Sequence, residues 1–97
     1  MKAILELEKK LTEAEIPHEM EEMFGGYIIG YPDLSDKRKG DVICHRGSYG
    51  YNQDLLEAMG FGINSADDGD DVVGYLTVEQ AFDYFWKEHT RKADIHD

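Results

Sequence analysis

Residues 18–31 read HEMEEMFGGYIIGY, and this stretch predicts a β-hairpin from which the rest of the fold can be placed. Met20 and Phe24 can share one face of the first strand, because side chains alternate across a strand. Gly25-Gly26 is a two-residue turn signal, since a type I′ turn needs positive φ at both central positions. Residues 27–31 then form the predicted return strand.

A second connection leads from the hairpin into a third strand. Pro32 ends the return strand because proline has no N–H to donate to the ladder. Residues 33–40 read as a polar loop, and residues 41–46, DVICHR, form the next predicted strand. Two hairpin connections in succession indicate a three-stranded antiparallel meander with the strand over residues 27–31 in the middle.

A helix is predicted at each end of the chain. In the first, Ile4, Leu7 and Leu11 recur at helical spacing, and Pro17 stops the helix. In the last, residues 77–80, TVEQ, match a capping box, so this helix begins at Val78. Its predicted apolar face consists of Val78, Ala81, Phe82, Phe85 and Trp86. We expect residues 93–97 to fray.

A third, shorter helix is predicted in the middle of the chain. Asn52 or Ser48 can cap a helix carrying Leu55, Leu56 and Met59, and the following glycine suits the left-handed position past its end. Residues 72–76 form an extended run that can add a fourth strand. The expected order is α-β-β-β-α-(β)-α, a single α+β domain over residues 1–97 with helices packed on a small antiparallel sheet.

The charge balance excludes several classes of function. The chain has 21 acidic and 10 basic residues, a net charge of -11, and such a field repels polyanions and argues against direct nucleic-acid binding. A single cysteine excludes an internal disulfide, and no apolar run approaches the roughly 20 residues of a membrane span. We therefore expect a cytoplasmic protein that does not contact a membrane.

The acidity is concentrated in residues 1–24 and 64–83. The simpler interpretation is a solvated surface with an acidic loop. The alternative is an acidic face that binds a basic protein, for example a nucleic-acid-binding protein, with a salt-dependent affinity and an increased association rate. The candidate contact residues are Glu6, Glu8, Glu13, Glu19, Glu21, Glu22, Asp67, Asp68, Asp70 and Asp71.

The junction HRGSYGYN, residues 45–52, offers a different kind of site. Its glycines allow close backbone approach, and the N-terminus of the helix predicted after it attracts anions. A turn plus a cap explains the same glycines, and neither a Walker loop nor a dinucleotide fingerprint is present. The alternative function is therefore binding of a nucleotide or another anion. The candidate residues are Arg46, Gly47, Ser48, Tyr49, Gly50 and Asn52.

The sequence contains no recognisable catalytic or metal-binding motif. The four histidines lack the spacing of a metal site, and an EF-hand alignment on Gly69 has no glutamate at its twelfth position. Cys44 and His45 are neighbours in a predicted strand, so their side chains point to opposite faces and cannot pair. We expect no enzymatic activity, metal or cofactor, while an exposed sheet edge leaves homo-oligomers open.

Three segments of the chain resemble a family of small acidic proteins found in phages and prophages of low-GC Gram-positive bacteria. These segments are IPHEMEEMFGGYIIGYP (16–32), HRGSYGYNQDLLEAMG (45–60) and DDVVGYLTVEQAFDYFWKEH (70–89). The resemblance implies a bacterial cytoplasm and expression from mobile DNA, and it transfers no catalytic residue. Since small acidic phage proteins often inhibit host enzymes or defence systems, we expect a protein that binds and modulates a basic host or phage protein.

Overall fold

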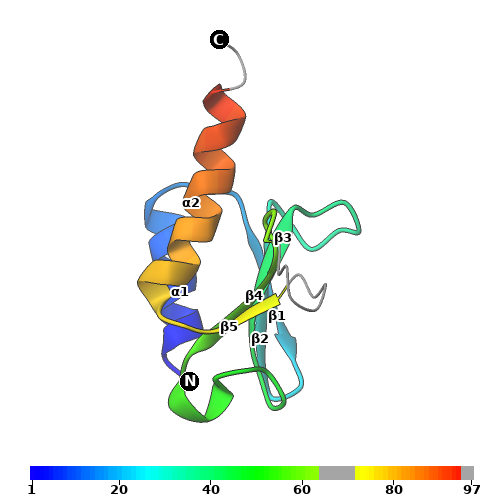
Figure 1. The fold of residues 1–97 in the computed structure, drawn as a ribbon, viewed down its shortest axis with the longest axis vertical. Coiled ribbons are helices and arrows are strands. Elements are labelled where there is room, and N and C mark those ends of the chain that lie inside the picture. The colour runs from blue at the N-terminus through cyan, green and yellow to red at the C-terminus, as the bar shows by residue number, and fades with distance from the viewer. Residues whose placement is uncertain (64–71, 95–97) are drawn as a thin grey trace.

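The computed structural model describes residues 1–63 and 72–94, in which two helices cover one face of a five-stranded antiparallel sheet (Figure 1). The strands follow one another across the sheet in chain order, β1-β2-β3-β4-β5. The α+β class is confirmed; the sheet contains the three predicted strands, the possible strand over residues 72–76, and one strand that was not predicted, β4. The elements are α1 (Ala3–Glu13), β1 (Glu19–Met23), β2 (Gly26–Tyr31), β3 (Gly40–Cys44), the 3-10 turn η1 (Tyr51–Gln53), β4 (Leu56–Gly60), β5 (Val72–Leu76) and α2 (Val78–Asp94).

Both terminal helices form where their patterns predict them. Ile4, Leu7 and Leu11 of α1 are fully buried. The capping box at the start of α2 is confirmed, because the Gln80 N–H donates to Thr77 Oγ1 at 3.2 Å and the Thr77 N–H donates to Gln80 Oε1 at 2.9 Å. α2 continues to Asp94, and residues 95–97 of the expected frayed tail lie outside the described residues.

The turn of the first hairpin lies one residue earlier than predicted. Met23 pairs with Gly26 in the ladder, so the turn residues are Phe24 and Gly25, with φ of 46° and 78°. Gly26 is instead a buried strand residue, and a Cβ there would lie 1.8 Å from the Cys44 carbonyl oxygen. The prediction of a Gly25-Gly26 turn is therefore wrong by one residue, and the glycine at position 26 is needed inside β2, where its backbone closely approaches β3.

The predicted middle helix is also wrong. The junction closes with only three residues of 3-10 helix, and the chain then enters β4, which pairs with β3 and β5. Asp54 ends η1 at φ 55°, and its carboxylate accepts N–H groups of Lys2 and Ala3 at the start of α1. Residues 72–76 therefore form the fifth strand, and the order is α-β-β-β-β-β-α.

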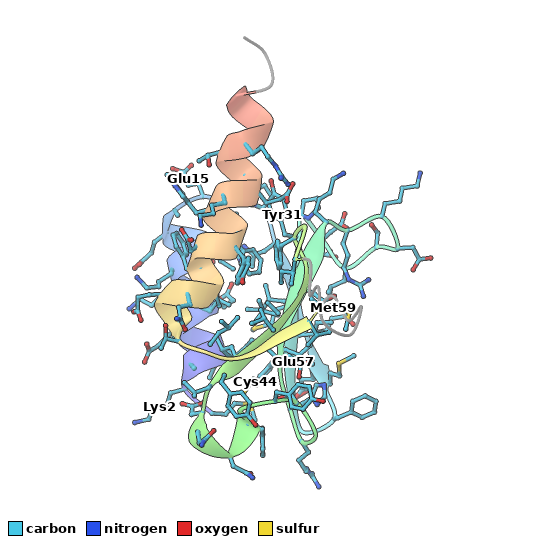
Figure 2. The ribbon with its side chains drawn as sticks, viewed as in Figure 1. Lys2, Glu15, Tyr31, Cys44, Glu57 and Met59 are labelled. Carbon is cyan, nitrogen blue, oxygen red and sulfur yellow. The ribbon has the colours of Figure 1, made fainter. Side chains whose placement is uncertain are left out.

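The core lies between the helices and the inner face of the sheet (Figure 2). The inward residues alternate along each strand, as for Leu56 and Ala58 in β4, and Phe85 of α2 is fully buried against them. Cys44 is buried on this face. The register places the row Glu21–Ile28–Ile43–Glu57 across the opposite, outer face.

Candidate functional site

The structure places the candidate acidic residues at different sites. Glu8, Glu19, Glu21 and Glu22 lie on or beside β1, the first strand of the sheet. Glu6 and Glu13 share the other flank of α1 with Lys10, whose ammonium lies 5.6 Å from the centre of the Phe82 ring in α2. Asp67, Asp68, Asp70 and Asp71 lie outside the described residues. The described acids therefore do not form a single patch.

Strand β1 is an acidic sheet edge. It pairs with β2 on one side, and none of the strands described in residues 1–63 and 72–94 pairs with its other side. Glu19, Glu21 and Glu22 are all exposed, and Met23 is half-buried. In the register, Glu19 and Glu21 face the outer side of the sheet, whereas Glu22 faces the helix side opposite Tyr27. Carboxylates therefore flank the free edge on both faces.

A hollow of about 590 Å³ lies beside this edge, between the start of α1 and the β1–β2 turn. Leu5 and Phe24, which line it, are 45% and 73% exposed, so apolar surface here is left in water. We call this hollow the β1 groove. Its lining consists of Met1, Leu5, Glu22, Met23, Phe24, Gly25, Gly26 and Tyr27. Apolar side chains and the carboxylate-bearing residue Glu22 thus line the same groove.

Two of the acidic side chains near β1 form hydrogen bonds within the protein. Glu8 Oε2 lies 2.9 Å from His18 Nε2, and hydrogen bonding to His18 lowers the pKa of Glu8 below its usual 4.5. Glu19 Oε1 accepts the Leu34 N–H at 2.9 Å, which fastens the 32–39 loop to the edge strand. Among the described residues, Glu21 and Glu22 take part in no ion pair.

The glycine-rich junction does not form the anion site expected of it. No helix follows it beyond the three residues of η1, and Arg46 lies against the β1–β2 turn, where a Cβ on Gly25 would be 2.9 Å from its Nε. Ser48 is buried in a closed turn, since its Oγ donates to the His45 carbonyl at 2.8 Å and accepts the His45 N–H. The junction therefore has neither the N-terminus of a long helix nor the Arg46 side chain that an anion site there was expected to use.

The other junction residues instead line a hollow of about 360 Å³ together with Tyr75 of β5. We call it the tyrosine cup, and its lining consists of Gly47, Ser48, Tyr49, Gly50, Tyr51, Asn52, Gln53 and Tyr75. Three of these residues, Tyr51, Gln53 and Tyr75, are absent from the set of candidates derived from the sequence. The signal for Tyr75 is the adjacent Gly74, where a Cβ would lie 2.5 Å from Tyr49 Cβ.

The described residues provide no metal site, no membrane-spanning helix and no activated thiol. No group of three His, Cys, Asp or Glu side chains within them is placed to hold a metal ion. Among the same residues, no helix combines the length and the apolar character needed to cross a membrane. Burial raises the pKa of the Cys44 thiol, which disfavours the thiolate needed for nucleophilic chemistry.

Comparison with known proteins adds no further constraint. No family model, no curated protein and no solved structure matches this chain. The features of this chain that bear on its function are therefore the geometry of β1, the β1 groove and the tyrosine cup.

Proposed function

We propose that this protein is a non-enzymatic interaction module that binds a basic, extended segment of a host or phage protein along strand β1. The observation that carries the proposal is the edge of β1 that no strand among the described residues pairs with, and three of the five residues of β1 are exposed glutamates. An added strand gains main-chain hydrogen bonds from such an edge, and side chains at alternate positions supply specificity. The partner is thus defined by its charge and by its extended conformation.

The alternation of β1 specifies the sequence of the bound segment. Lysine or arginine side chains of an added strand would lie opposite Glu21 on the outer face and opposite Glu22 on the helix face. Opposite charges at such cross-strand positions contribute about 0.2–1 kcal/mol for each pair. An apolar residue of the segment would enter the β1 groove against Leu5 and Phe24, which are exposed in the free protein.

The same charges disfavour a second copy of this chain as the occupant. Antiparallel pairing of β1 with itself over its full length would set the two Glu21 carboxylates directly opposite each other, and like charges in such positions are destabilising. Edge strands are commonly protected from self-association by charged side chains in this way. The net charge of -11 also accelerates encounter with a basic partner and slows encounter with another copy.

The proposal is tested with a synthetic lysine–valine peptide of repeat Lys-Lys-Val-Val, labelled for fluorescence anisotropy, because two consecutive lysines face opposite sides of a strand and can meet both Glu21 and Glu22. We expect binding that weakens with added salt, and no binding of a glutamate–valine peptide. Two N-methylated forms of the peptide are compared, one methylated on the odd-numbered amides and one on the even-numbered amides. Only one of these two sets of amides points toward β1 in an added strand, so one of the two peptides should lose binding. Loss of salt dependence, or insensitivity to both N-methylated peptides, would show that β1 is not the site.

A pair of matched variants separates local contact from net charge. Glu21→Gln/Glu22→Gln removes two charges from β1, and Glu6→Gln/Glu13→Gln removes two from the far flank of α1. We expect the β1 variant to bind about fivefold more weakly, corresponding to about 1 kcal/mol for two exposed ion pairs, with a much smaller effect of the α1 variant. Equal weakening by both would leave only a long-range charge effect and refute contact at β1.

A further inference from the structure

We propose that the tyrosine cup is a binding site for an uncharged planar heterocycle, of the nucleobase or nucleoside class. The site goes beyond the function proposed for β1, because it combines η1 and its preceding loop with β5, at the opposite end of the strand order. Its hollow of about 360 Å³ falls near the lower end of the roughly 300–1,000 Å³ typical of small-molecule sites.

Two exposed aromatic rings supply the stacking surface. The ring centroids of Tyr49 and Tyr75 are 6.4 Å apart with an angle of 30° between their planes. The two residues are 60% and 58% exposed, so their faces are open to solvent. Stacking of a base on an aromatic side chain contributes about 1–3 kcal/mol and tolerates different bases. A flat ring is therefore the ligand shape that these side chains favour.

The backbone on both sides of the cup is held in place before any ligand arrives. The Tyr49 N–H donates to Glu57 Oε1 at 2.7 Å, and Glu57 is buried on the outer face of the sheet. Gly74 lets β5 approach the Tyr49 side chain, because any Cβ there would collide with it. A backbone that is already held in place loses little freedom on binding, which lowers the entropic cost of ligand capture.

Tyr75 carries a conformational cost that its own packing does not repay. Its φ of 58° lies in the left-handed region, which costs a non-glycine residue of order 1–3 kcal/mol. Its ring is more than half exposed, so burial in the core does not offset this cost. Strained residues of this kind cluster at ligand sites. The positive φ of Tyr75 is thus consistent with its ring being part of a ligand site.

The rim of the cup selects against charge on the ligand. Asn52 and Gln53 present exposed amides, which both donate and accept hydrogen bonds, as the edge of a base requires. No lysine or arginine is among the described residues that line the cup, and Arg46 lies against the β1–β2 turn. With a net charge of -11, the protein also repels phosphate. The expected ligand is a nucleoside and not its phosphorylated form.

The experiment is a titration of the full chain, labelled with nitrogen-15, with adenosine, guanosine, cytidine and uridine. We expect saturable shifts of the Tyr49, Gly50 and Tyr75 amides, and at least tenfold weaker binding of each matching 5′-monophosphate. Tyr75→Gly removes one ring and also relieves the positive φ, so the fold is retained and the dissociation constant rises about tenfold. Folding of each variant is checked by its dispersed amide spectrum.

Phe24→Gly is the matched control, because Phe24 is another exposed aromatic residue at positive φ and lies in the β1–β2 turn. It should leave nucleoside binding unchanged, and Tyr75→Gly should leave binding of the lysine–valine peptide unchanged. Failure at one site is therefore distinguishable from failure at the other. Absence of shifts with every nucleoside, equal affinity for the monophosphates, or equal weakening by both variants would each overturn the proposal.

Discussion

His18 Nε2 lies 2.9 Å from Glu8 Oε2, so this side-chain pair joins helix α1 to the residue that precedes β1. The other ring nitrogen, Nδ1, lies 2.7 Å from the Ile16 carbonyl oxygen. Together these two contacts tie the residue before β1 to helix α1 and to the turn that follows the helix.

The contact between Glu8 and His18 makes a pH-dependent contribution to stability. Because hydrogen bonding to His18 lowers the pKa of Glu8, the contribution of this carboxyl is present above its usual value of 4.5 and is lost as the pH falls through its lower folded value. We expect Glu8→Gln to cost about 0.5 kcal/mol near neutral pH, as for a partly exposed pair, and progressively less on acidification. Urea denaturation across this pH range measures the difference.

Glu13→Gln is the control, because Glu13 is exposed on α1 and forms no ion pair with any residue that the structure describes. A difference between wild type and Glu8→Gln that stays constant down to the acid transition would contradict an ionised Glu8 as its source.

Gly26 is expected to be much less replaceable than a typical turn glycine. Its Cβ would lie 1.8 Å from the Cys44 carbonyl oxygen, so Gly26→Ala must push β2 away from β3. We expect a loss of about 3 kcal/mol or more in the free energy of unfolding. Gly62→Ala, at φ 72° with nothing within 4 Å of the new Cβ, should cost about 1–2 kcal/mol from backbone strain alone. Urea denaturation measures the free energy of unfolding of both variants. A larger loss for Gly62→Ala than for Gly26→Ala would contradict the close approach of Gly26 to β3.

The fold could be predicted from the sequence where its signals are local, and not where pairing between distant segments decides the structure. Helix periodicity and the capping box act within a few residues, so both terminal helices were predictable. In residues 52–59, the spacing of Leu55, Leu56 and Met59 also suits a helix, while Leu56 and Ala58 suit a strand. The choice is made by pairing with β3 and β5, which local patterns do not contain.

The candidate site was predictable in its chemistry but not in its grouping. The acidic residues could be identified from the sequence, whereas the division of Glu6 from Glu22 depends on which flank of α1 meets the sheet. Tyr75 joins Tyr49 only because β4 turns the chain back across the sheet, 26 positions later in the sequence. The tyrosine cup is therefore formed by long-range strand pairing, and no local sequence motif predicts it.

Cys44 should behave as a core residue and not as a reactive thiol. The residue is fully buried, and burial raises its thiol pKa, so both access and thiolate content are low. We expect iodoacetamide to modify the native protein at least about a hundredfold more slowly than the urea-unfolded chain, because modification requires opening of the core. Mass spectrometry of timed samples measures both rates. Rapid labelling of the folded protein, checked by circular dichroism, would contradict this burial.

Arg38 should stabilise the protein through the buried carboxylate of Asp41. Arg38 Nε donates to Asp41 Oδ2 at 3.0 Å, and Asp41 is only 7% exposed. Arg38→Gln leaves this acceptor without its cation, with an expected loss of about 1.5–3 kcal/mol in the free energy of unfolding. Lys37→Gln, an exposed change in the same loop, should stay within about 0.5 kcal/mol of wild type.

A double-mutant cycle isolates the interaction between Arg38 and Asp41. Because Asp41→Asn removes the charge that Arg38→Gln leaves unpaired, the double variant should be more stable than the two single losses added together, by about 1 kcal/mol. Arg38 Nη1 also donates to the carbonyl oxygens of Leu34 and Ser35, and the Leu34 N–H donates to Glu19. Loosening this loop should therefore weaken binding of the lysine–valine peptide at β1 as well. Additive losses in urea denaturation would show that the two side chains act independently.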